Sequence, residues 1–193
     1  MNQKITEEAI KAFEVIKKGG VILYPSDTIW GIGCDALQEK AVNKVYSIKE
    51  RHSSKALIVL LSQRNELEKY VSNVPLIALE LMDKINKPLT IIYPNAKNLP
   101  SNLIAEDGSI AIRISKCGFC QTLIKLMDRP LVSSSANISD EPTPLYFKQI
   151  TSNIISSVDH IVNLQRHEVI EANPSTIIRF KNDFDFEIVR NTL

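Results

Sequence analysis

The sequence predicts an α/β protein in which a mostly parallel or mixed β-sheet is covered by helices. Short runs rich in β-branched and aromatic residues alternate along the chain with longer segments of helical period. The 193 residues suit one domain with a single large core, and no internal repeat, low-complexity tract or linker divides them. We therefore expect one domain over residues 1–193.

The first helix and the first strand are predicted near the start of the sequence. Thr6 can cap a helix whose predicted inward stripe consists of three apolar residues, Ile10, Phe13 and Ile16. The glycines at 19 and 20 end this helix. The apolar run 21–24 is typical of a buried strand, and Pro25 stops it because proline lacks a backbone N–H.

A polar turn leads from this strand into a second helix. Residues 26–28 are Ser-Asp-Thr and follow the carboxyl end of the strand, where open α/β sheets bind ligands. Glycines within residues 31–33 predict a loop with tight turns. A helical apolar period begins at Gln38, and Lys49 and Arg51 lie at its far end. Either these cations form a solvated helix end, or they serve a binding site.

The remainder of the chain continues the alternation of strands and helices. Strands are predicted over residues 57–61, 89–93, 110–114, 131–132 and 160–164, with a closing hairpin over 176–180 and 186–190. Helices are predicted over residues 63–71, 75–85, 118–128 and 145–157. Pro75 suits the first turn of its helix, which is expected to point three apolar side chains inward, Leu76, Leu79 and Met82.

Arg113 is an unusual residue for a predicted strand. The run 110–114, Ile-Ala-Ile-Arg-Ile, alternates, so Arg113 shares a face with Ala111 while the isoleucines point the other way. The local pattern leaves two functions open. Arg113 is either a charge that protects an edge strand from aggregation, or a buried clamp for an anionic group.

Composition and charge exclude several classes of protein. The 23 lysines and arginines balance 22 acidic residues, which argues against binding of nucleic acid by bulk electrostatics but leaves a local basic patch open. The sequence shows no signal-like segment, no run long enough to span a bilayer and no lipidation motif. Three cysteines do not make a disulfide framework. We predict a soluble, cytoplasmic protein without membrane contact.

The sequence does not contain the standard catalytic motifs with the residue spacing that they require. No glycine-rich loop precedes a Lys-Ser/Thr pair, and Gly-Ile-Gly at 31–33 lacks the third glycine of a dinucleotide fingerprint. The three histidines lack metal-ligand spacing, and no glycine flanks the serines at 133–135 as in a nucleophile elbow. Cys117 and Cys120 have the spacing of a redox or zinc pair, but one such pair is a weak signal. The alternative is two half-buried thiols at a helix start.

Five polar clusters remain, each at or beside a predicted strand end: residues 26–28, Lys49 with Arg51, Arg113, residues 133–137 and residues 174–176. Hydroxyl and amide groups orient neutral and oxyanion groups, whereas lysine and arginine offset the charge of a polyphosphate. An anionic, hydroxyl-bearing ligand that meets a nucleotide would need this mixture. We therefore expect the clusters to converge in one cavity.

In these clusters the chain resembles the YrdC-like family, in particular its threonylcarbamoyl-adenylate synthases. The matching segments are Pro-Ser-Asp-Thr-Ile-Trp-Gly at 25–31, Lys-Glu-Arg at 49–51, Pro-Leu-Thr at 88–90, Ser-Ile-Ala-Ile-Arg at 109–113, the segment 130–137 that ends in Ser-Ala-Asn, and Pro-Ser-Thr-Ile-Ile at 174–178. Their order and spacing hold over nearly the whole chain. The resemblance implies a single-domain YrdC-like fold, a twisted open mixed sheet flanked by helices around a large concave cavity.

The resemblance also implies a reaction. L-threonine, bicarbonate and ATP give threonylcarbamoyl-adenylate and pyrophosphate, with Mg²⁺ on the phosphates. A downstream transferase complex then modifies an adenosine beside the anticodon of certain tRNAs, so tRNA is an indirect partner. The implied threonine ligands are Ser26, Arg113, Ser133 and Ser175. The implied ATP ligands are Lys49, Ser53, Ser109, Ser135, Asn137, Thr143 and Arg190. Lys49 and Arg51 are the implied catalytic residues, and Lys49 is expected at a site that reaches solvent; no metal ligand is assigned.

Several positions depart from the family pattern, among them residues 86–88, Asn-Lys-Pro in place of Pro-Gly-Pro, and Asn191 in place of proline after Arg190. Ser26 replaces threonine, Trp30 replaces tyrosine, and Asp140 stands where glycine is usual. The alternative function is a double-stranded RNA-binding or ribosome-associated module on the same fold without synthase activity, which the near-neutral charge disfavours. A side branch of the family lacks the full Lys-x-Arg and Ser-x-Asn pairs, and both pairs are intact here.

Overall fold

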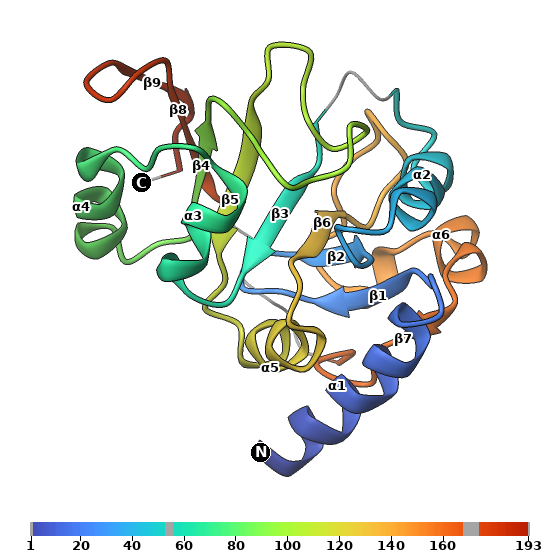
Figure 1. The fold of residues 1–193 in the computed structure, drawn as a ribbon. Helices are drawn as coiled ribbons and strands as arrows, with labels where there is room; N and C mark the ends of the chain where they lie inside the picture. Colours follow the sequence, from blue (N-terminus) through green and yellow to red (C-terminus); the bar gives the residue numbers. More distant parts are fainter. Residues whose placement is uncertain (1, 53–55, 168–173, 193) are drawn as a thin grey trace.

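The computed structural model describes residues 2–52, 56–167 and 174–192. Over these residues nine strands form one sheet: β1 Ile22–Pro25, β2 Trp30–Gly33, β3 Ile58–Leu61, β4 Leu89–Tyr93, β5 Ile110–Ile114, β6 Leu131–Ser135, β7 His160–Ile161, β8 Thr176–Phe180 and β9 Phe186–Arg190. Their spatial order is β7-β1-β2-β6-β3-β5-β4-β8-β9 (Figure 1). The pairs β1–β7, β3–β5 and β4–β8 are parallel and the other neighbours antiparallel, so the predicted mixed sheet is confirmed.

Helices lie in the connections β2–β3, β3–β4, β5–β6 and β6–β7, and one helix precedes β1. Within the described ranges they are α1 Asn2–Ile16, α2 Glu39–Ile48, α3 Leu67–Tyr70, α4 Leu76–Lys84, α5 Gly118–Met127 and α6 Ser152–Ser157, with 3₁₀ turns η1 Arg64–Glu66 and η2 Phe147–Gln149. None of the helices in these ranges combines the length and the apolar character that crossing a membrane requires.

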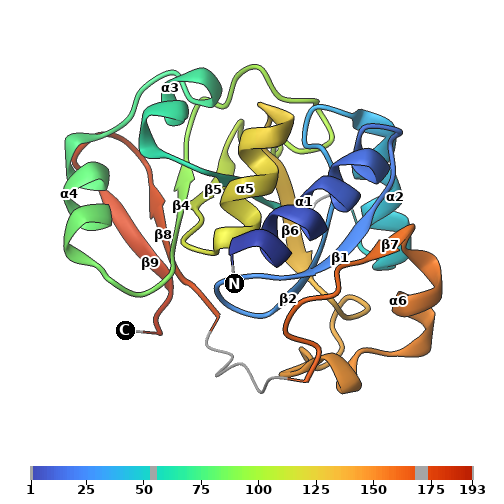
Figure 2. The ribbon, with the colours of Figure 1, turned by 90° about the horizontal axis from the view of Figure 1, so that it is seen from below.

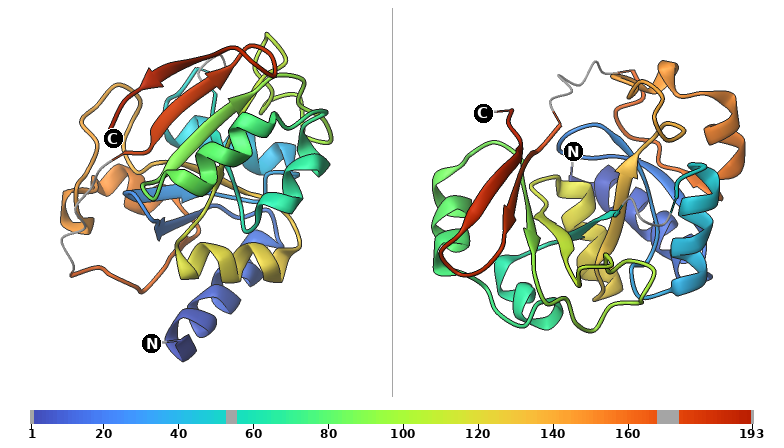
Figure 3. Two further views of the ribbon diagram at one scale, coloured as in Figure 1. Left: turned by 90° about the vertical axis from the view of Figure 1, so that its left-hand side faces the viewer. Right: turned by 90° about the horizontal axis from the view of Figure 1, so that it is seen from above.

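The sheet carries a buried core on each face, because strand residues alternate between the two faces. On one face α1 and α5 lie side by side (Figure 2), and their apolar residues meet Tyr24 and Leu60. On the other face residues of α2, α3, α4 and α6 pack with Leu23, Val59 and Ile112. There α4 lies near the β4–β8 end of the sheet (Figure 3). A ligand-binding site on the sheet therefore has to lie where neither core covers the strands.

The glycine-containing loop expected over residues 31–33 is instead strand β2. It pairs antiparallel with β1 and with β6, so the prediction of a loop is wrong. Gly33 fits here because a Cβ atom at this position would lie 2.0 Å from the carbonyl oxygen of Val132. The glycine permits a close approach of two strands rather than a turn.

The N-terminal helix differs from its prediction in its start and its buried face. It begins at Asn2, so Thr6 lies inside it and is not its cap. Ile10 is 47% exposed, whereas the buried face includes small and branched residues, Ala9, Ala12 and Ile16. Small side chains let α1 approach α5 closely, so the buried face contains Ala9 and Ala12 together with the predicted Ile16, and only Ile10 of the predicted stripe is exposed.

Two further helices differ from expectation. Leu76 is 76% exposed, because α4 buries Ala78 instead. The helix expected over residues 145–157 is split into η2 and α6, with extended backbone at Ile150 and Thr151 between them. Neither difference affects the strands that form the site.

Candidate active site

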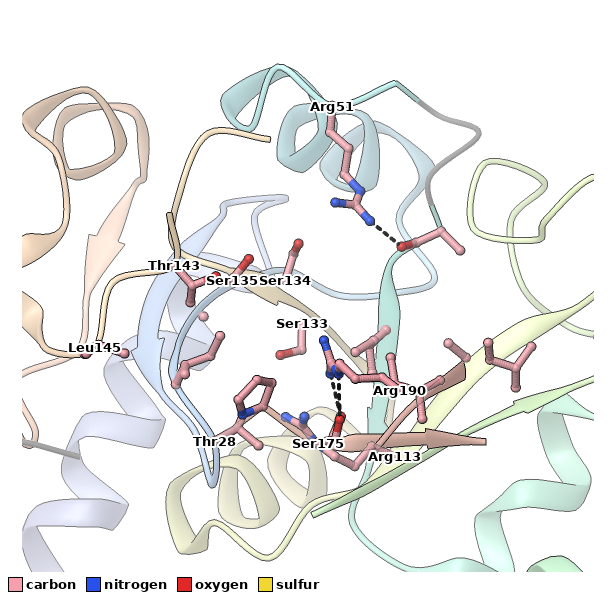
Figure 4. A pocket seen from close by; sticks show the side chains of 18 residues that line it. Thr28, Arg51, Arg113, Ser133, Ser134, Ser135, Thr143, Leu145, Ser175 and Arg190 are labelled. Atoms are coloured by element: carbon pink, nitrogen blue, oxygen red, sulfur yellow. Dashed lines mark hydrogen bonds between the residues drawn. The ribbon is translucent and has the colours of Figure 1, made fainter. Parts of the chain in front are cut away.

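A cavity of about 410 Å³ lies on the face of the sheet that also carries α1 and α5, beyond the residues that these helices cover (Figure 4). This volume is within the range of small-ligand sites. Seven residues of the sequence-predicted set line it: Arg51, Arg113, Ser133, Ser135, Thr143, Ser175 and Arg190. The expected convergence of the polar clusters is confirmed for these residues.

The strand side of the cavity follows from the register of the sheet. Ile58 of β3 pairs with Ala111 of β5 and with Ser133 of β6. Ala111 also pairs with Ile92 of β4. Residues paired in register lie on the same face, so these side chains form a continuous floor. Arg113 lies two residues after Ala111 on β5 and therefore points to the same side.

Arg113 is buried in the middle of the sheet, with 4% of its side chain exposed. Strand β5 has β3 on one side and β4 on the other, so the edge-strand interpretation is wrong. Its Nη2 lies 3.2 Å from Oδ1 of Asp27, and Oδ2 of Asp27 accepts the backbone N–H of Lys116 at 3.1 Å. Nε of Arg113 has no hydrogen-bond partner among the described residues. A buried donor without a partner is costly, which points to a ligand as its missing acceptor.

Arg190 adds a second guanidinium group close to Arg113. Its Nε donates to the carbonyl oxygen of Ser175 at 2.8 Å and its Nη2 to Oγ of Ser175 at 3.2 Å (Figure 4). Oγ of Ser175 also shares a hydrogen bond of 2.7 Å with Oγ1 of Thr90. Burial, and then the charge of Arg113, lowers the pKa of Arg190. Two arginines outweigh the carboxylate of Asp27 here, which favours an anionic ligand group.

Arg51 lies across the cavity from this pair of arginines (Figure 4). Its Nη2 donates to the carbonyl oxygen of Ala56 at 2.9 Å, and burial lowers its pKa. Thr143, which is exposed, and Leu145, which is 49% exposed, continue the same side. This side is made of segments that follow α2 and β6 rather than of strands.

Lys49 lies behind the cavity rather than in it. It is 1% exposed, and its Nζ donates to the carbonyl oxygens of Ser135 and Asn137, the latter at 2.7 Å. Burial, and then the nearby charge of Arg51, lowers the pKa of Lys49 to about 7. The expectation of a solvent-reaching lysine is wrong, because the backbone that follows β6 folds over it and supplies its hydrogen-bond acceptors.

Ser26 also lies just behind the lining. Its Oγ donates to the carbonyl oxygen of Ile29 at 2.7 Å and accepts the backbone N–H of Thr28 at 3.1 Å. The hydroxyl therefore fixes the turn between β1 and β2, whose residues Thr28 and Ile29 do line the cavity. Either a threonine or a serine hydroxyl can make these bonds, which explains how serine serves at this position.

The other predicted ligands stand apart from the lining. The side-chain amide of Asn137 donates to the carbonyl oxygens of Ile138 and Glu141 and so shapes the segment after β6. Ser109 is buried just before β5 and is not among the lining residues. Ser53 lies outside the described residues. Asp140 has a φ of 67°, the left-handed conformation that glycine adopts most readily and that aspartate tolerates.

Sequence reasoning missed most of the apolar lining. Ile58, Ile92 and Ile177 lie on three different strands and face the cavity together with Ala111. Only Ile177 lies near a predicted ligand in the sequence, Ser175, whereas the strands of Ile58 and Ile92 carry none. Reading which face they occupy required the pairing of the strands, and the sequence does not reveal that pairing.

The sequence matches a known protein family and named relatives over most of its length. The sequence model of the Sua5/YciO/YrdC family, described as telomere recombination, matches residues 14–192. A Methanocaldococcus jannaschii protein, provisionally named a threonylcarbamoyl-AMP synthase, is 35% identical over 182 residues, which are 92% of this chain and 84% of its own length.

Solved structures share the fold. Sua5 of P. abyssi, solved in complex with L-threonine, superposes with a TM-score of 0.86 at 25% identity. That match covers 98% of this chain and 54% of the P. abyssi chain, so the chain spans about half the length of that protein. YciO of E. coli superposes with a TM-score of 0.81 at 23% identity over 98% of this chain and 89% of its own.

Proposed function

Because the chain belongs to the Sua5/YciO/YrdC family, we propose that it is an L-threonylcarbamoyladenylate synthase. In this reaction L-threonine, bicarbonate and ATP give threonylcarbamoyl-AMP and pyrophosphate, which makes the enzyme a nucleotidyltransferase. The observation that carries the proposal is the buried Arg113 with an unpaired Nε in a cavity that also presents serine hydroxyls. Binding of L-threonine by Sua5 of P. abyssi, which has the same fold, supports it.

The threonine subsite is assigned to the strand side of the cavity. The planar guanidinium of Arg113 suits a carboxylate, which it can hold through two parallel N–H donors. Asp27 holds that guanidinium from behind. Ser133 and Ser175, which line the same cavity, are assigned to the amine and the hydroxyl of the amino acid. The hydroxyl of Ser26 contributes by fixing the adjoining turn.

ATP is assigned to the opposite side, near Arg51, Ser135 and Thr143, with Arg190 between the two subsites. The threonine amine takes up carbon dioxide from bicarbonate, and the resulting carbamate attacks the α-phosphorus of ATP. Such a step needs placement and charge offset more than covalent help from the protein. Arg51 and Arg190 supply that charge. Ser53, Ser109 and Asn137 stay predicted ATP ligands.

Lys49 is assigned an indirect part in this scheme. Its ammonium group holds the carbonyl oxygens of Ser135 and Asn137, so it positions the segment that carries the Ser135 hydroxyl. A pKa of about 7 lets this group lose its proton near neutral pH. Lys49 belongs to the Lys-x-Arg pair, and its hydrogen bonds to the backbone carbonyl groups of Ser135 and Asn137 connect it to the Ser-x-Asn pair.

Mg²⁺ is expected to enter with the phosphates of ATP. The cavity lining consists of hydroxyl, guanidinium and apolar side chains, and the described residues contain no group of three or more His, Cys, Asp or Glu side chains that could hold a metal. The described side chains therefore do not fit a protein-bound metal, and no step is assigned to one. The transferase partner, the tRNA target and the cytoplasmic location stay predictions.

The test is the release of pyrophosphate from ATP by the purified protein. We expect release only when threonine and bicarbonate are both supplied, and calorimetric titration with threonine, then with ATP, should show that the protein binds each. Glycine in place of threonine is the matched control. Release that ignores threonine would contradict the proposal. A protein that shifts duplex RNA in a gel but shows no threonine-dependent release would instead be the RNA-binding module.

A further inference from the structure

Two thiols that the proposed reaction does not use contact Pro25, at the start of the turn whose residues Thr28 and Ile29 line the cavity. Cys117 is the residue that caps the start of α5, and Cys120 lies within its first turn. Their sulfur atoms both approach the carbonyl oxygen of Pro25, at 3.6 Å and 3.9 Å respectively. Cys117 is half-buried, whereas Cys120 is fully buried. Both are free thiols that converge on one point from a single helical turn.

The two thiols have different chemical environments. A hydrogen bond from the Cys120 thiol, together with the backbone N–H groups of Phe119 and Cys120 at the helix start, lowers the pKa of Cys117 to about 7 against the effect of burial. Burial raises the pKa of Cys120 well above its ordinary value. Attack on a disulfide is fastest for a thiol whose pKa lies near the ambient pH. Cys117 is therefore suited to attack first and Cys120 to react second.

We propose that Cys117 and Cys120 are a dithiol site that forms a reversible internal disulfide by exchange with a small-molecule disulfide. The Cys117 thiolate attacks one sulfur of the small disulfide, and one small thiolate leaves and takes up a proton. The Cys120 thiol then loses its proton and attacks the Cys117 sulfur, which releases the second small thiol. Two electrons pass from the protein dithiol to the small disulfide, so the exchange balances.

Oxidation of this site reaches the cavity through the turn between β1 and β2. The disulfide removes both S–H groups from the carbonyl oxygen of Pro25, one residue before Ser26. The residue before Cys117, Lys116, donates its backbone N–H to Asp27, the carboxylate that holds Arg113. A change in the first turn of α5 therefore acts on this turn at two places, Pro25 and Asp27. We expect weaker threonine binding in the oxidised protein, and this part rests on the proposed function.

The site is tested on the full chain in buffers that range from reduced to oxidised glutathione. After each incubation free thiols are alkylated and the protein is analysed by mass spectrometry. We expect a species that has lost two hydrogen atoms, with the link mapped between Cys117 and Cys120, and its reversal by added reduced glutathione. Two alkylated thiols at these positions across the whole series, or a link only between separate chains, would overturn the proposal.

Single substitutions separate the two thiols. Cys120→Ser should stop at a mixed disulfide between Cys117 and glutathione, whereas Cys117→Ser should form no adduct, because Cys120 is buried. Cys34→Ala is the matched control, because Cys34 is a buried free thiol in the core on the other face of the sheet, and it should leave the exchange unchanged. Thermal unfolding of each variant shows whether it is folded. A folded Cys117→Ser protein that reacts as readily as the parent would contradict the assigned order.

Threonine titration of the reduced and oxidised forms tests the coupling to the cavity. We expect affinity several-fold lower after oxidation and restored by reduction, and no such difference in Cys117→Ser, which forms no adduct. Equal affinity in both forms would overturn the coupling. A protein that binds no threonine in either form counts against the proposed function instead, while the disulfide measurement stands by itself.

Discussion

The two sides of the cavity are built in different ways. On the strand side Arg113 is 4% exposed, paired with Asp27, and held in a central strand whose register with its neighbours fixes its direction. On the other side Arg51, Thr143 and Leu145 come from connecting segments, and Leu145 is 49% exposed. A buried side chain in a sheet has one position available, whereas an exposed connecting segment has several.

This difference suggests a division of labour between the two subsites. A small amino acid is recognised by a few donors in fixed geometry, which suits the strand side. A larger nucleotide needs a side that can adapt around it, which suits the connecting segments. Substitutions should therefore have large, local effects on the strand side and graded effects on the other.

The largest effect is expected from Arg113→Ala. Loss of the guanidinium removes charge-assisted hydrogen bonds of about 1.5–3 kcal/mol each, so threonine affinity should fall roughly 100-fold in calorimetric titration. The change also leaves Asp27 buried without its partner, which should lower the free energy of unfolding by about 3–5 kcal/mol.

Arg113→Lys separates the effect on threonine binding from the effect on the stability of the buried ion pair with Asp27. It keeps a positive charge beside Asp27 but loses the planar fork, so stability should largely return while threonine affinity stays low. An Arg113→Ala protein that bound threonine as the parent does would show that the strand side is not the amino-acid subsite.

A smaller effect is expected from the titration of Lys49. Its pKa in the folded protein, about 7, lies below its ordinary value, so the unfolded chain binds more protons between the two values. The free energy of unfolding should therefore rise with pH in this window, by about 2 kcal/mol between about pH 7 and pH 9. Urea unfolding of the parent and of Lys49→Met at a series of pH values measures this contribution as the difference between the two slopes.

Lys40→Met is the matched control for this measurement, because Lys40 is an exposed lysine on the same helix. It should retain the pH slope of the parent, whereas Lys49→Met should lose it. Equal slopes for the parent and Lys49→Met would mean that Lys49 keeps its proton throughout and binds its carbonyl partners as a permanent cation.

The smallest effect is expected from Thr143→Val, on the exposed side of the cavity. One neutral hydrogen bond contributes about 0.5–1.5 kcal/mol, so ATP affinity should fall roughly threefold while threonine affinity is unchanged. Thr143→Ser keeps the hydroxyl and should bind ATP as the parent does. A larger loss of threonine affinity than of ATP affinity would reverse the assignment of the two sides.

The sequence predicted features that depend on neighbouring residues and missed features that depend on distant ones. The alternation of Arg113 with Ala111 is local, and it correctly placed both residues on one face of a strand. The prediction for Gly33 was wrong, because glycine is needed there to let the backbone of Val132 approach closely. Val132 lies about a hundred residues further along the chain. The prediction that Lys49 reaches solvent failed for a similar reason. The carbonyl oxygens that accept its hydrogen bonds belong to Ser135 and Asn137, which are also distant in the sequence.

Local pattern selected the polar clusters that contain Arg51, Arg113 and the serines, whereas Thr143, Arg190 and the role of each residue came from the family resemblance. Serines at a strand end are common, and no spacing rule connects Ser133 with Ser175 or Arg190. Their meeting depends on the pairing of β4 with β5 and β8, which brings distant segments together. The apolar floor was missed because register decides which isoleucines face the cavity.

The central position of Arg113 has a consequence for how the protein reaches its working form. Its neighbours in the cavity come from β2, β6 and the final hairpin, so no short fragment of the chain contains the complete set. Closing such long chain segments costs conformational entropy before the contacts they bring can offset it, which slows folding. We therefore expect threonine recognition to be among the last properties acquired by a newly made chain, once β8 has joined β4.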